Sequence, residues 1–408
     1  MKISDFKTFV VGTPPPHRGG PVWVFVKLVT NNGIVGYGEI FGVPFRADVV
    51  AAMIEDVAAR HVVGTSPFET ERLWRIVYAR GYGQHPDHSI LGVLSGIEMA
   101  CWDIVGKALD QPVYNLLGGK VQETLRSYTY LYPSDEDLAK VASGEVDALA
   151  IANIFGDPVR GPERALEYVA QGFTAVKFDP IMPMGSFDPR MPSLEALDNA
   201  ERMVKNMREA VGTKCDLLIG THGQTTTAGA IRLAKRMEPY DPLWFEEPVP
   251  PDNVAEMGKV ARATSIPIAT GERLSTKYEF AALFAHGGCA IIQPALGRVG
   301  GILEAKKIAG MAEAHYVQIA PHLYCGPLEA AANIQIGACS PNFLIQESIQ
   351  QFDGFHAELL KKPIQWQDGF IIPPSEPGLG VELDEEVAEA HPYAGDLFPL
   401  MEEQPVWP

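Results

Sequence analysis

Short apolar runs alternate with longer amphipathic stretches through the middle of the chain. Eight such runs lie at residues 127–130, 175–177, 217–220, 243–246, 268–271, 291–293, 317–320 and 344–347. The spacers have helical periodicity, and parallel strands need helical crossovers of this kind. We therefore predict a closed barrel of parallel strands. A doubly wound sheet is the alternative, but no Gly-x-Gly-x-x-Gly sequence follows the first run.

The two ends of the chain have a different pattern. Apolar stretches at 22–28 and 34–40 flank an Asn31-Asn32-Gly33 turn and predict antiparallel strands. Between 49 and 117 the periodicity is helical. Beyond residue 351 the chain is rich in turns, and we expect this tail to pack back on the N-terminal part.

Composition and charge narrow the class of protein. The 408 residues are 46% hydrophobic, which is enough for a large core, and the formal charge is 33 − 51 = −18. This charge argues against general binding to nucleic acid or to an anionic membrane. Five scattered cysteines form no C-x-x-C pair, and neither a signal sequence nor a membrane-spanning stretch is evident. We expect a cytoplasmic protein that binds neither nucleic acid nor membrane.

Two acidic residues at the ends of neighbouring runs are the strongest chemical signal. Glu246 and Glu272 are 272 − 246 = 26 positions apart, the length of one strand, one helix and their loops. Parallel barrels carry their functional residues at the C-terminal ends of the strands. Two carboxylates there can share a hard cation such as Mg²⁺. The alternative is that both are solvated loop residues.

Several motifs in a fixed order together resemble one known family. They are Gly-Tyr-Gly-Glu at 36–39, Glu-Met-Ala-Cys-Trp-Asp-Ile-Val-Gly-Lys at 98–107, Leu-Leu-Gly-Gly at 116–119, Val-Lys-Phe-Asp-Pro at 176–180, Phe-Glu-Glu-Pro at 245–248, Gly-Glu-Arg-Leu at 271–274, Val-Gly-Gly-Ile at 299–302 and Ala-Pro-His at 320–322. The arrangement resembles the mandelate racemase-like sugar-acid dehydratases of the enolase superfamily, of the galactonate or gluconate dehydratase kind.

The resemblance implies a fold and a reaction. The implied fold class is α/β, a modified TIM (β/α) barrel with an α+β capping domain. The expected parts are a capping domain at 1–122, the barrel at 123–352 and a C-terminal segment at 353–408. The implied reaction is Mg²⁺-dependent removal of the α-proton of an aldonate or aldarate, with loss of the β-hydroxyl to give a 2-keto-3-deoxy acid. A small carboxylate is the expected partner, and a homo-oligomer is the expected assembly.

Two other functions stay open at this point. One is a racemase, epimerase or cycloisomerase of a carboxylate with an altered proton path. The other is a catalytically impaired relative that binds a ligand or regulates. The implied dehydration needs strong catalytic assistance, because an α-proton beside a carboxylate is very weakly acidic. Its removal needs a placed base and fixed positive charge or hydrogen-bond donors for the growing negative charge.

The metal ligands depart from the family pattern. Glu246 and Glu272 match two of the three usual ligands, but the third position, 26 residues before Glu246, is Gly220. Glycine has no side chain with which to coordinate. Water or substrate oxygens could complete the shell, Asp216 could approach from an altered strand, or the metal could bind weakly.

The resemblance also implies catalytic roles. His322 is the expected base, although the Asp that usually supports it is Ala295. His222 is the expected general acid, and a metal ligand or a cap on the barrel mouth are alternatives for it. Lys177 is expected to bind the substrate carboxylate or act as an electrophile, because the second Lys of the usual Lys-x-Lys motif is replaced by Asp179. A simple Lys177–Asp179 ion pair at the rim is the alternative.

Further residues are candidates for binding the substrate. Glu347, at the end of the eighth run, matches a residue that bonds the substrate carboxylate in the family, and Asp179 lies near Lys177 in the sequence. Arg18 and Arg46 lie in two stretches that match loops closing the site, and Tyr82 lies in a third polar and aromatic stretch.

Overall fold

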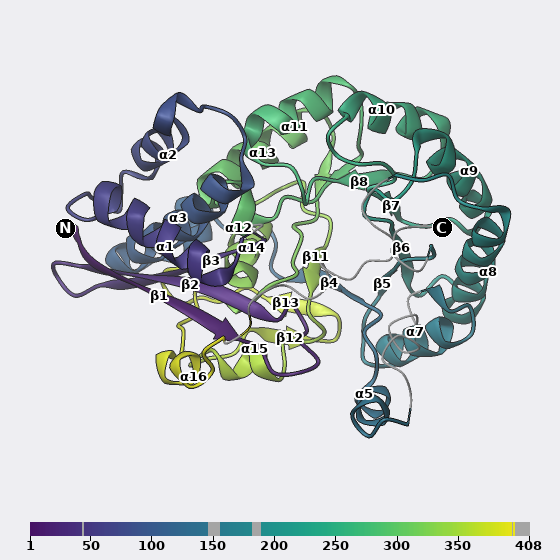
Figure 1. Ribbon diagram of the computed structural model, residues 1–408, viewed down its shortest axis with the longest axis horizontal. Coiled ribbons are helices and arrows are strands. Elements are labelled where there is room, and N and C mark those ends of the chain that lie inside the picture. The colour runs from purple at the N-terminus through teal and green to yellow at the C-terminus, as the bar shows by residue number, and fades with distance from the viewer. Residues whose placement is uncertain (43–44, 146–155, 182–188, 394, 396–408) are drawn as a thin grey trace.

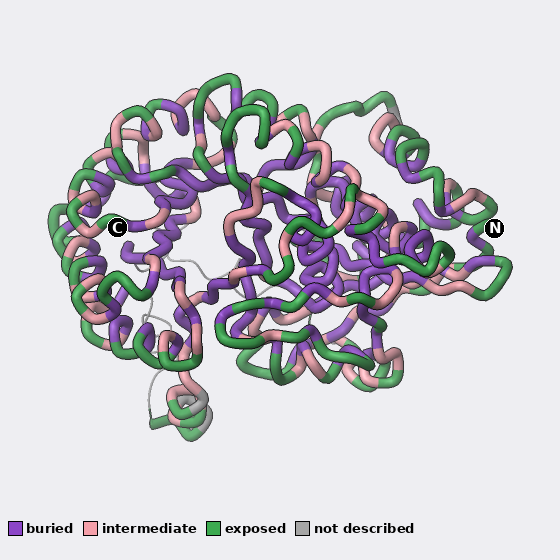
Figure 2. The backbone as a smooth tube through the Cα atoms, turned by 180° about the vertical axis from the view of Figure 1, so that it is seen from behind, coloured by how far each residue is buried: buried purple, intermediate pink, exposed green. Residues whose placement is uncertain are grey.

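The computed structural model describes residues 1–42, 45–145, 156–181, 189–393 and 395. Figure 1 shows an N-terminal sheet with helices packed on it, beside a ring of helices that surrounds inner strands. In Figure 2 the buried residues follow the inner strands and the sheet, whereas exposed residues lie on the outer faces of the helices. The last described elements lie beside the N-terminal sheet, far along the chain from it.

The N-terminal region is a three-stranded antiparallel sheet covered by helices. The strands are β1 (Ile3–Gly12), β2 (Val22–Thr30) and β3 (Val35–Ile40). The helices are α1 (Ala47–Val57), its π-helical continuation η1 (Ala58–Val62), α2 (Thr70–Tyr78), the 3-10 turn η2 (Arg80–Tyr82), α3 (His88–Leu109) and α4 (Val113–Leu116).

Helix α3 is the centre of this region. Asp87 caps its first turn by accepting hydrogen bonds from the Ser89 and Ile90 amides. A Cβ on Gly38 of β3 would lie 2.0 Å from the Gly96 carbonyl oxygen, so the strand and helix approach closely only because Gly38 lacks a side chain. Among the described helices α3 alone is long and apolar enough to cross a membrane, but 83% of that stretch is buried inside the molecule, as expected of a core helix.

Eight parallel strands form the barrel, and each coincides with one of the predicted apolar runs. They are β4 (Leu125–Tyr130), β5 (Ala175–Phe178), β6 (Asp216–Gly220), β7 (Trp244–Glu246), β8 (Ile268–Thr270), β9 (Ile291–Ile292), β10 (Gln318–Ile319) and β11 (Gln346–Ser348). Consecutive strands from β4 to β10 pair in parallel. Strand β11 pairs with β4, and a bridge between Ile319 of β10 and Phe343, just before β11, closes the ring. The predicted barrel is confirmed.

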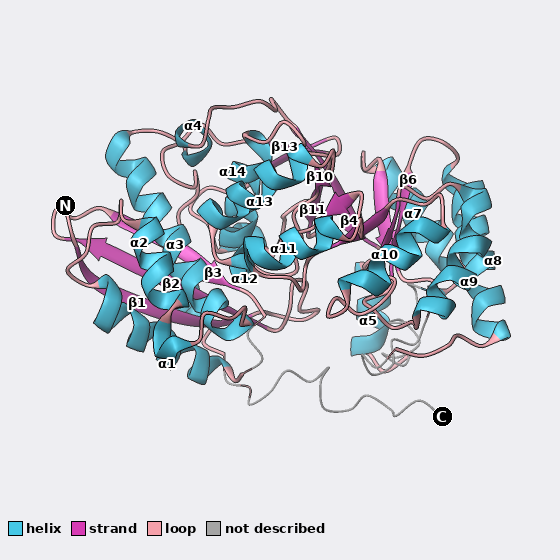
Figure 3. Ribbon diagram, turned by 90° about the horizontal axis from the view of Figure 1, so that it is seen from above, coloured by secondary structure: helices cyan, strands magenta, loops and turns pink. Residues whose placement is uncertain are grey.

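The helices in the crossovers are α5 (Asp135–Ala142), α7 (Arg160–Ala170), α8 (Leu194–Val211), α9 (Thr227–Met237) with the 3-10 turn η4 (Glu238–Tyr240), α10 (Val254–Ala263), α11 (Thr276–Ala285), α12 (Leu296–Val299), α13 (Ile302–Ala314) and α14 (Pro327–Ala338). They surround the barrel strands, as Figures 1 and 3 show, except that α5 lies apart from this ring and the short α12 packs on α3. Ser193, Thr226 and Asn253 cap α8, α9 and α10 with side-chain oxygens, a signal that the sequence carries.

The chain after the barrel contains regular structure where turns were predicted. Its elements are α15 (Phe355–Glu358), β12 (Gln365–Gln367), β13 (Phe370–Ile372) and α16 (Glu385–Ala390). Asp368 and Gly369 form the turn of a hairpin in which β12 pairs with β13, and β13 in turn pairs with β4. Glu385 accepts hydrogen bonds from Lys27 and Tyr37, so the segment does contact the N-terminal sheet. The exact division at residues 122 and 352 stays a prediction, and 394 and 396–408 lie outside the described residues.

Buried carboxylates from two of the family motifs join the N-terminal region to the barrel. Glu39, near the end of β3, accepts hydrogen bonds from the amides of Gly326, Leu328 and Glu329 at the start of α14. Glu98 of α3 likewise accepts bonds from the first two amides of α13. The first amides of a helix have no partner within the helix, and these carboxyl oxygens supply the acceptors. The contacts hold the end of β3, and with it Phe41, over the barrel mouth.

Candidate active site

A polar layer lies across the C-terminal end of the barrel, directly above an apolar one. The lower layer is a buried cluster with one inward residue from each strand or strand end: Tyr128, Ala175, Leu218, Trp244, Ala269, Ile291, Ala320 and Ile345. Side chains two positions further along a strand point to the same face. The upper layer therefore comprises Tyr130, Lys177, Gly220, Glu246, Gly271 with the adjacent Glu272, Gln293, His322 and Glu347. All the predicted strand-end residues belong to this layer or border it.

Lys177 is the central cation of the layer. Its ammonium donates to Glu246 Oε1 at 2.5 Å and to Glu347 Oε1 at 3.5 Å, and all three side chains are buried. Burial works against the charged form, but the two carboxylates raise the pKa of Lys177 above its ordinary value. Burial also raises the pKa of Glu347 to about 7, against the opposing effect of Lys177. Lys177 is thus a fixed positive charge, and the alternative of a Lys177–Asp179 pair is not what the side chains form.

His322 faces the layer from β10 and lacks its usual support. Its Nε2 lies 3.3 Å from Glu272 Oε2 and 3.9 Å from Glu347 Oε2. Its Nδ1 is buried and has no hydrogen-bond partner among the described residues, which is the expected consequence of alanine at position 295. Burial lowers the pKa of His322 to about 3, against the attraction of Glu272, so the imidazole is neutral near pH 7.

His222 and Asp179 form a second pair on the opposite side of the layer. His222 Nδ1 lies 3.4 Å from Asp179 Oδ2, while Asp179 Oδ1 accepts a 2.9 Å bond from the Tyr130 hydroxyl. Burial alone would lower the pKa of His222, but the neighbouring Asp179 carboxylate outweighs it and raises that pKa to about 9. The two histidines therefore differ in charge near neutral pH.

The space beside Gly220 is occupied rather than vacant. A Cβ on Gly220 would meet Asp179 Oδ1, so the Asp179 carboxylate fills the room that a larger residue 220 would take. Asp216, considered as a replacement ligand, begins β6 at the opposite end of the strand from Gly220. There it pairs with Arg126 at 2.7 Å. That alternative is wrong.

The three residues predicted from the loops have different surroundings. Arg18 is half-buried, and its charge acts on Tyr168 and on His356 of α15. Arg46 is exposed and its guanidinium forms a two-bond ion pair with Asp48. Tyr82 is fully exposed. Their contacts with a substrate stay predictions.

Four residues of the site were not predicted from the sequence. Gln293 donates to Glu246 Oε2 at 2.7 Å, and Tyr130 holds Asp179 as described above. The centre of the Phe41 ring lies 5.3 Å from that of the His322 ring. The half-buried Arg298 guanidinium lies 4.4 Å from the centre of the same Phe41 ring. The signal for Gln293 and Tyr130 was available, because each follows an inward apolar residue by two positions. Phe41, directly after β3, and Arg298, in the short helix α12, carry no such signal, because neither lies two positions after an inward strand residue.

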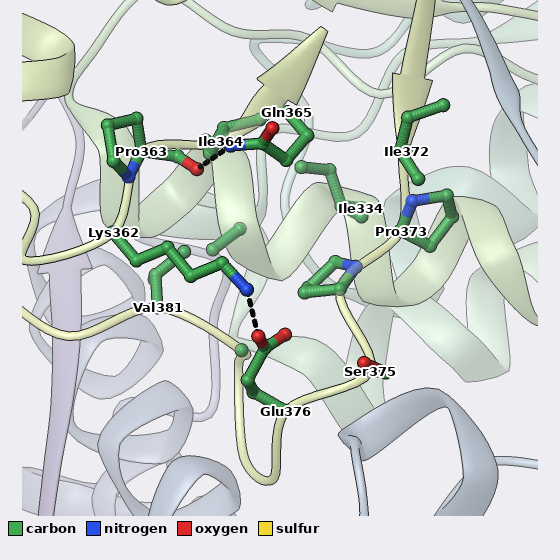
Figure 4. Close-up of a pocket in the computed structure, with 13 residues that line it drawn as sticks. Ile334, Lys362, Pro363, Ile364, Gln365, Ile372, Pro373, Ser375, Glu376 and Val381 are labelled. Atoms are coloured by element: carbon green, nitrogen blue, oxygen red, sulfur yellow. Dashed lines mark hydrogen bonds and ion pairs between the residues drawn. The ribbon is translucent and has the colours of Figure 1, made fainter.

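A separate pocket lies outside the barrel mouth. It encloses about 150 Å³ between α14 and the C-terminal segment, and the Lys362–Glu376 ion pair crosses one side of it, as Figure 4 shows. Its apolar lining includes Ile334, Ile364, Ile372 and three prolines. It contains none of the polar layer, so the chemistry belongs at the barrel mouth.

Comparison with known proteins agrees with this architecture. Residues 162–387 match the enolase C-terminal domain-like family, and residues 18–118 match the N-terminal domain of mandelate racemase and muconate lactonizing enzyme. The chain belongs to the enolase superfamily, in its mandelate racemase/muconate lactonizing enzyme branch. It is a hydro-lyase of that branch.

Relatives of known name span the whole chain. It is 35% identical to the D-galactonate dehydratase of Klebsiella pneumoniae (strain 342), over 100% of this chain and 97% of that protein. It is 36% identical to the D-galactonate dehydratase of Ralstonia nicotianae, over 94% and 93%. A protein of Labrenzia alexandrii DFL-11, classed with the mandelate racemases and muconate lactonizing enzymes, is 58% identical with a TM-score of 0.92, covering 98% and 99%.

Members of this superfamily generally bind Mg²⁺, and the donor set has the right chemistry for it. Glu246 and Glu272 offer hard carboxylate oxygens, and the buried Glu272 Oε2 accepts no hydrogen bond from the described residues. Two features oppose a ready-made site. Among the described side chains no three His, Cys, Asp or Glu groups are already gathered as a ligand cluster, and the Lys177 ammonium occupies Glu246 Oε1. A cation must compete with that ammonium.

Proposed function

We propose that the protein dehydrates a sugar acid, an aldonate or aldarate, to a 2-keto-3-deoxy acid. His322 would take the α-proton, and His222 would protonate the departing β-hydroxyl. The placement of the two histidines carries this proposal. They extend from β10 and β6, which are four strands apart in either direction around the eight-stranded ring. A substrate lying across the polar layer would meet one imidazole on each side.

The charge states of the two histidines suit these roles. A base must begin neutral and an acid must begin protonated. Burial keeps His322 neutral, and Asp179 keeps His222 protonated. Environments that push two titrating groups apart are how one site performs acid and base steps at one pH. The imidazolium formed at His322 would be stabilised by Glu272, 3.3 Å away, in place of the usual Asp.

Fixed positive charge is available for the negative charge that grows on the substrate. Lys177 stays an ammonium at the centre of the layer, within reach of a substrate carboxylate. Glu246 and Glu272 would hold Mg²⁺, whose charge offsets the same growing negative charge. Two observations support the proposed substrate class. The relatives are named D-galactonate dehydratases, and the site has two histidines, one for breaking the Cα–H bond and one for breaking the Cβ–O bond.

The test separates the two proton transfers. Purified protein is screened against aldonates and aldarates for 2-keto product, and the active substrate is then incubated in D₂O. His322→Asn should lose both product and exchange of the α-proton. His222→Asn should lose product but retain exchange, because the α-proton is removed before the hydroxyl leaves.

His286→Asn serves as the matched control, because His286 lies at the exposed end of α11 and should retain both activities. Exchange that survives in His322→Asn would remove that residue from the role of base. Inversion at the α-carbon without loss of water would favour the racemase or epimerase alternative instead.

A further inference from the structure

Asp179 lies beside Gly220 at the C-terminal end of the barrel, where the family pattern has a metal-binding carboxylate on β6. Strand β6 ends at Gly220, where the family places a carboxylate, and the neighbouring strand β5 is followed by Asp179. A Cβ built on Gly220 would lie 2.4 Å from Asp179 Oδ1 and 2.9 Å from the Tyr130 hydroxyl. Asp179 is 3% exposed, so its carboxylate is inside the site and not at a solvated rim.

The 2.4 Å distance has a simple meaning. With ordinary C–C and C–O bond lengths, a carboxylate oxygen of aspartate lies about 2.4 Å from its own Cβ. Asp179 Oδ1 therefore lies at the same distance from the Cβ position of residue 220 as an oxygen of an aspartate at 220 would. The Asp179 carboxylate, which comes from the adjacent strand, thus occupies part of the space in which a side chain at position 220 would lie.

Strand register explains how the equivalent arises. Phe178 pairs with Ile219 in the parallel β5–β6 ladder, so Asp179 lies level with Gly220. Gly220 in turn pairs with Glu246 of β7. Asp179, the empty Cβ position of Gly220 and Glu246 therefore follow one another at one level of the barrel. The register therefore places the carboxylate that follows β5 at the level of Glu246, with Gly220 between them.

We propose that Asp179 supplies the third oxygen ligand, so that Asp179, Glu246 and Glu272 hold the divalent cation. This inference rests on the proposed function only for the presence of that cation. The Tyr130 hydroxyl fixes Asp179 Oδ1 through a 2.9 Å hydrogen bond, as partners of ligating carboxylates commonly do. The three side chains are not gathered in the metal-free arrangement of the described residues. The cation must draw them together and take Glu246 Oε1 from Lys177.

Metal binding without substrate tests the proposal. Mn²⁺, which accepts the same oxygen ligands as Mg²⁺, is titrated into the full chain and followed by its free-ion electron paramagnetic resonance signal. Wild-type protein should bind one ion. Asp179→Asn should weaken binding by more than the roughly 10–100-fold that loss of an indirect partner costs.

A carboxylate exchange between the strands is the decisive comparison. Gly220→Asp alone should not tighten binding, because its carboxylate would collide with Asp179. Asp179→Gly combined with Gly220→Asp returns the carboxylate to β6 and should restore the affinity lost in Asp179→Gly. Asp216→Asn is the matched control, since Asp216 lies at the other end of β6, and it should bind Mn²⁺ as wild type does.

Three outcomes would overturn the inference: no Mn²⁺ bound by wild type, unchanged affinity in a folded Asp179→Asn, or tighter binding by Gly220→Asp alone. The Mn²⁺ affinity of Gly220→Asp can be measured whether or not the Asp179 variants fold. Because no substrate is used, a failed sugar-acid screen with intact Asp179-dependent Mn²⁺ binding would count against the proposed function and leave this inference standing.

Discussion

Replacing Glu39 should loosen the N-terminal region from the barrel. Its side chain is fully buried and accepts hydrogen bonds from three amides at the start of α14, at 2.5, 3.1 and 2.9 Å. Glu39→Ala leaves those three amides without an acceptor. An unsatisfied buried donor costs about 1–3 kcal/mol. Removing the buried polar carboxyl group offsets part of this cost. We therefore expect Glu39→Ala to lower the free energy of unfolding by about 3 kcal/mol at pH 5.

The pH dependence of this loss has a definite sign. Burial, reinforced by Glu329, raises the pKa of Glu39 from 4.5 to about 8 in the folded protein. The folded state therefore holds a proton that the unfolded state releases between about pH 4.5 and 8. Wild-type stability falls across that interval by up to about 1.4 kcal/mol per pH unit from this group. Glu39→Ala lacks this contribution, so its deficit should shrink as the pH rises from 5 to 8.

Two measurements check the reasoning. Urea unfolding of both proteins at pH 5, 6, 7 and 8 gives the difference in free energy, and hydrogen exchange reports the amides of Gly326, Leu328 and Glu329 directly. Glu389→Ala is the control, because its ion pair with Lys7 is exposed and should be worth less than about 1 kcal/mol. A deficit that grows with pH would refute the argument, since it would mean that the charged carboxylate stabilises α14 more than its burial costs.

Two other predictions concern the active site. Ala295→Asp should give the unpartnered His322 Nδ1 a carboxylate and raise the pKa of that imidazole, which an NMR titration measures; an unchanged pKa would show that residue 295 does not reach the ring. Arg298→Met should raise KM more than it lowers kcat, because the Arg298 guanidinium packs on Phe41 beside His322 and offers positive charge to an acidic substrate. A fall in kcat with KM unchanged would contradict that role.

The sequence by itself determined the barrel and most of its polar layer. Buried parallel strands appear in a sequence as short apolar runs. When helical segments separate eight such runs, few folds other than a β/α barrel are compatible with the pattern. The alternation of side chains along a strand then fixes which residues share a face. Lys177, Glu246, His322 and Glu347 each follow an inward apolar residue by two positions, and so their convergence could be predicted from local pattern alone.

Only the tertiary structure decided what those residues contact. Asp179 and Gly220 are far apart in the chain, and nothing local shows that one fills the space of the other; the register of β5 against β6 does. The same holds for Glu39, whose partners lie in α14, and for Phe41, which reaches His322 from a loop. Strand periodicity is a property of neighbouring residues, whereas these contacts depend on long-range packing, which no short stretch of sequence specifies.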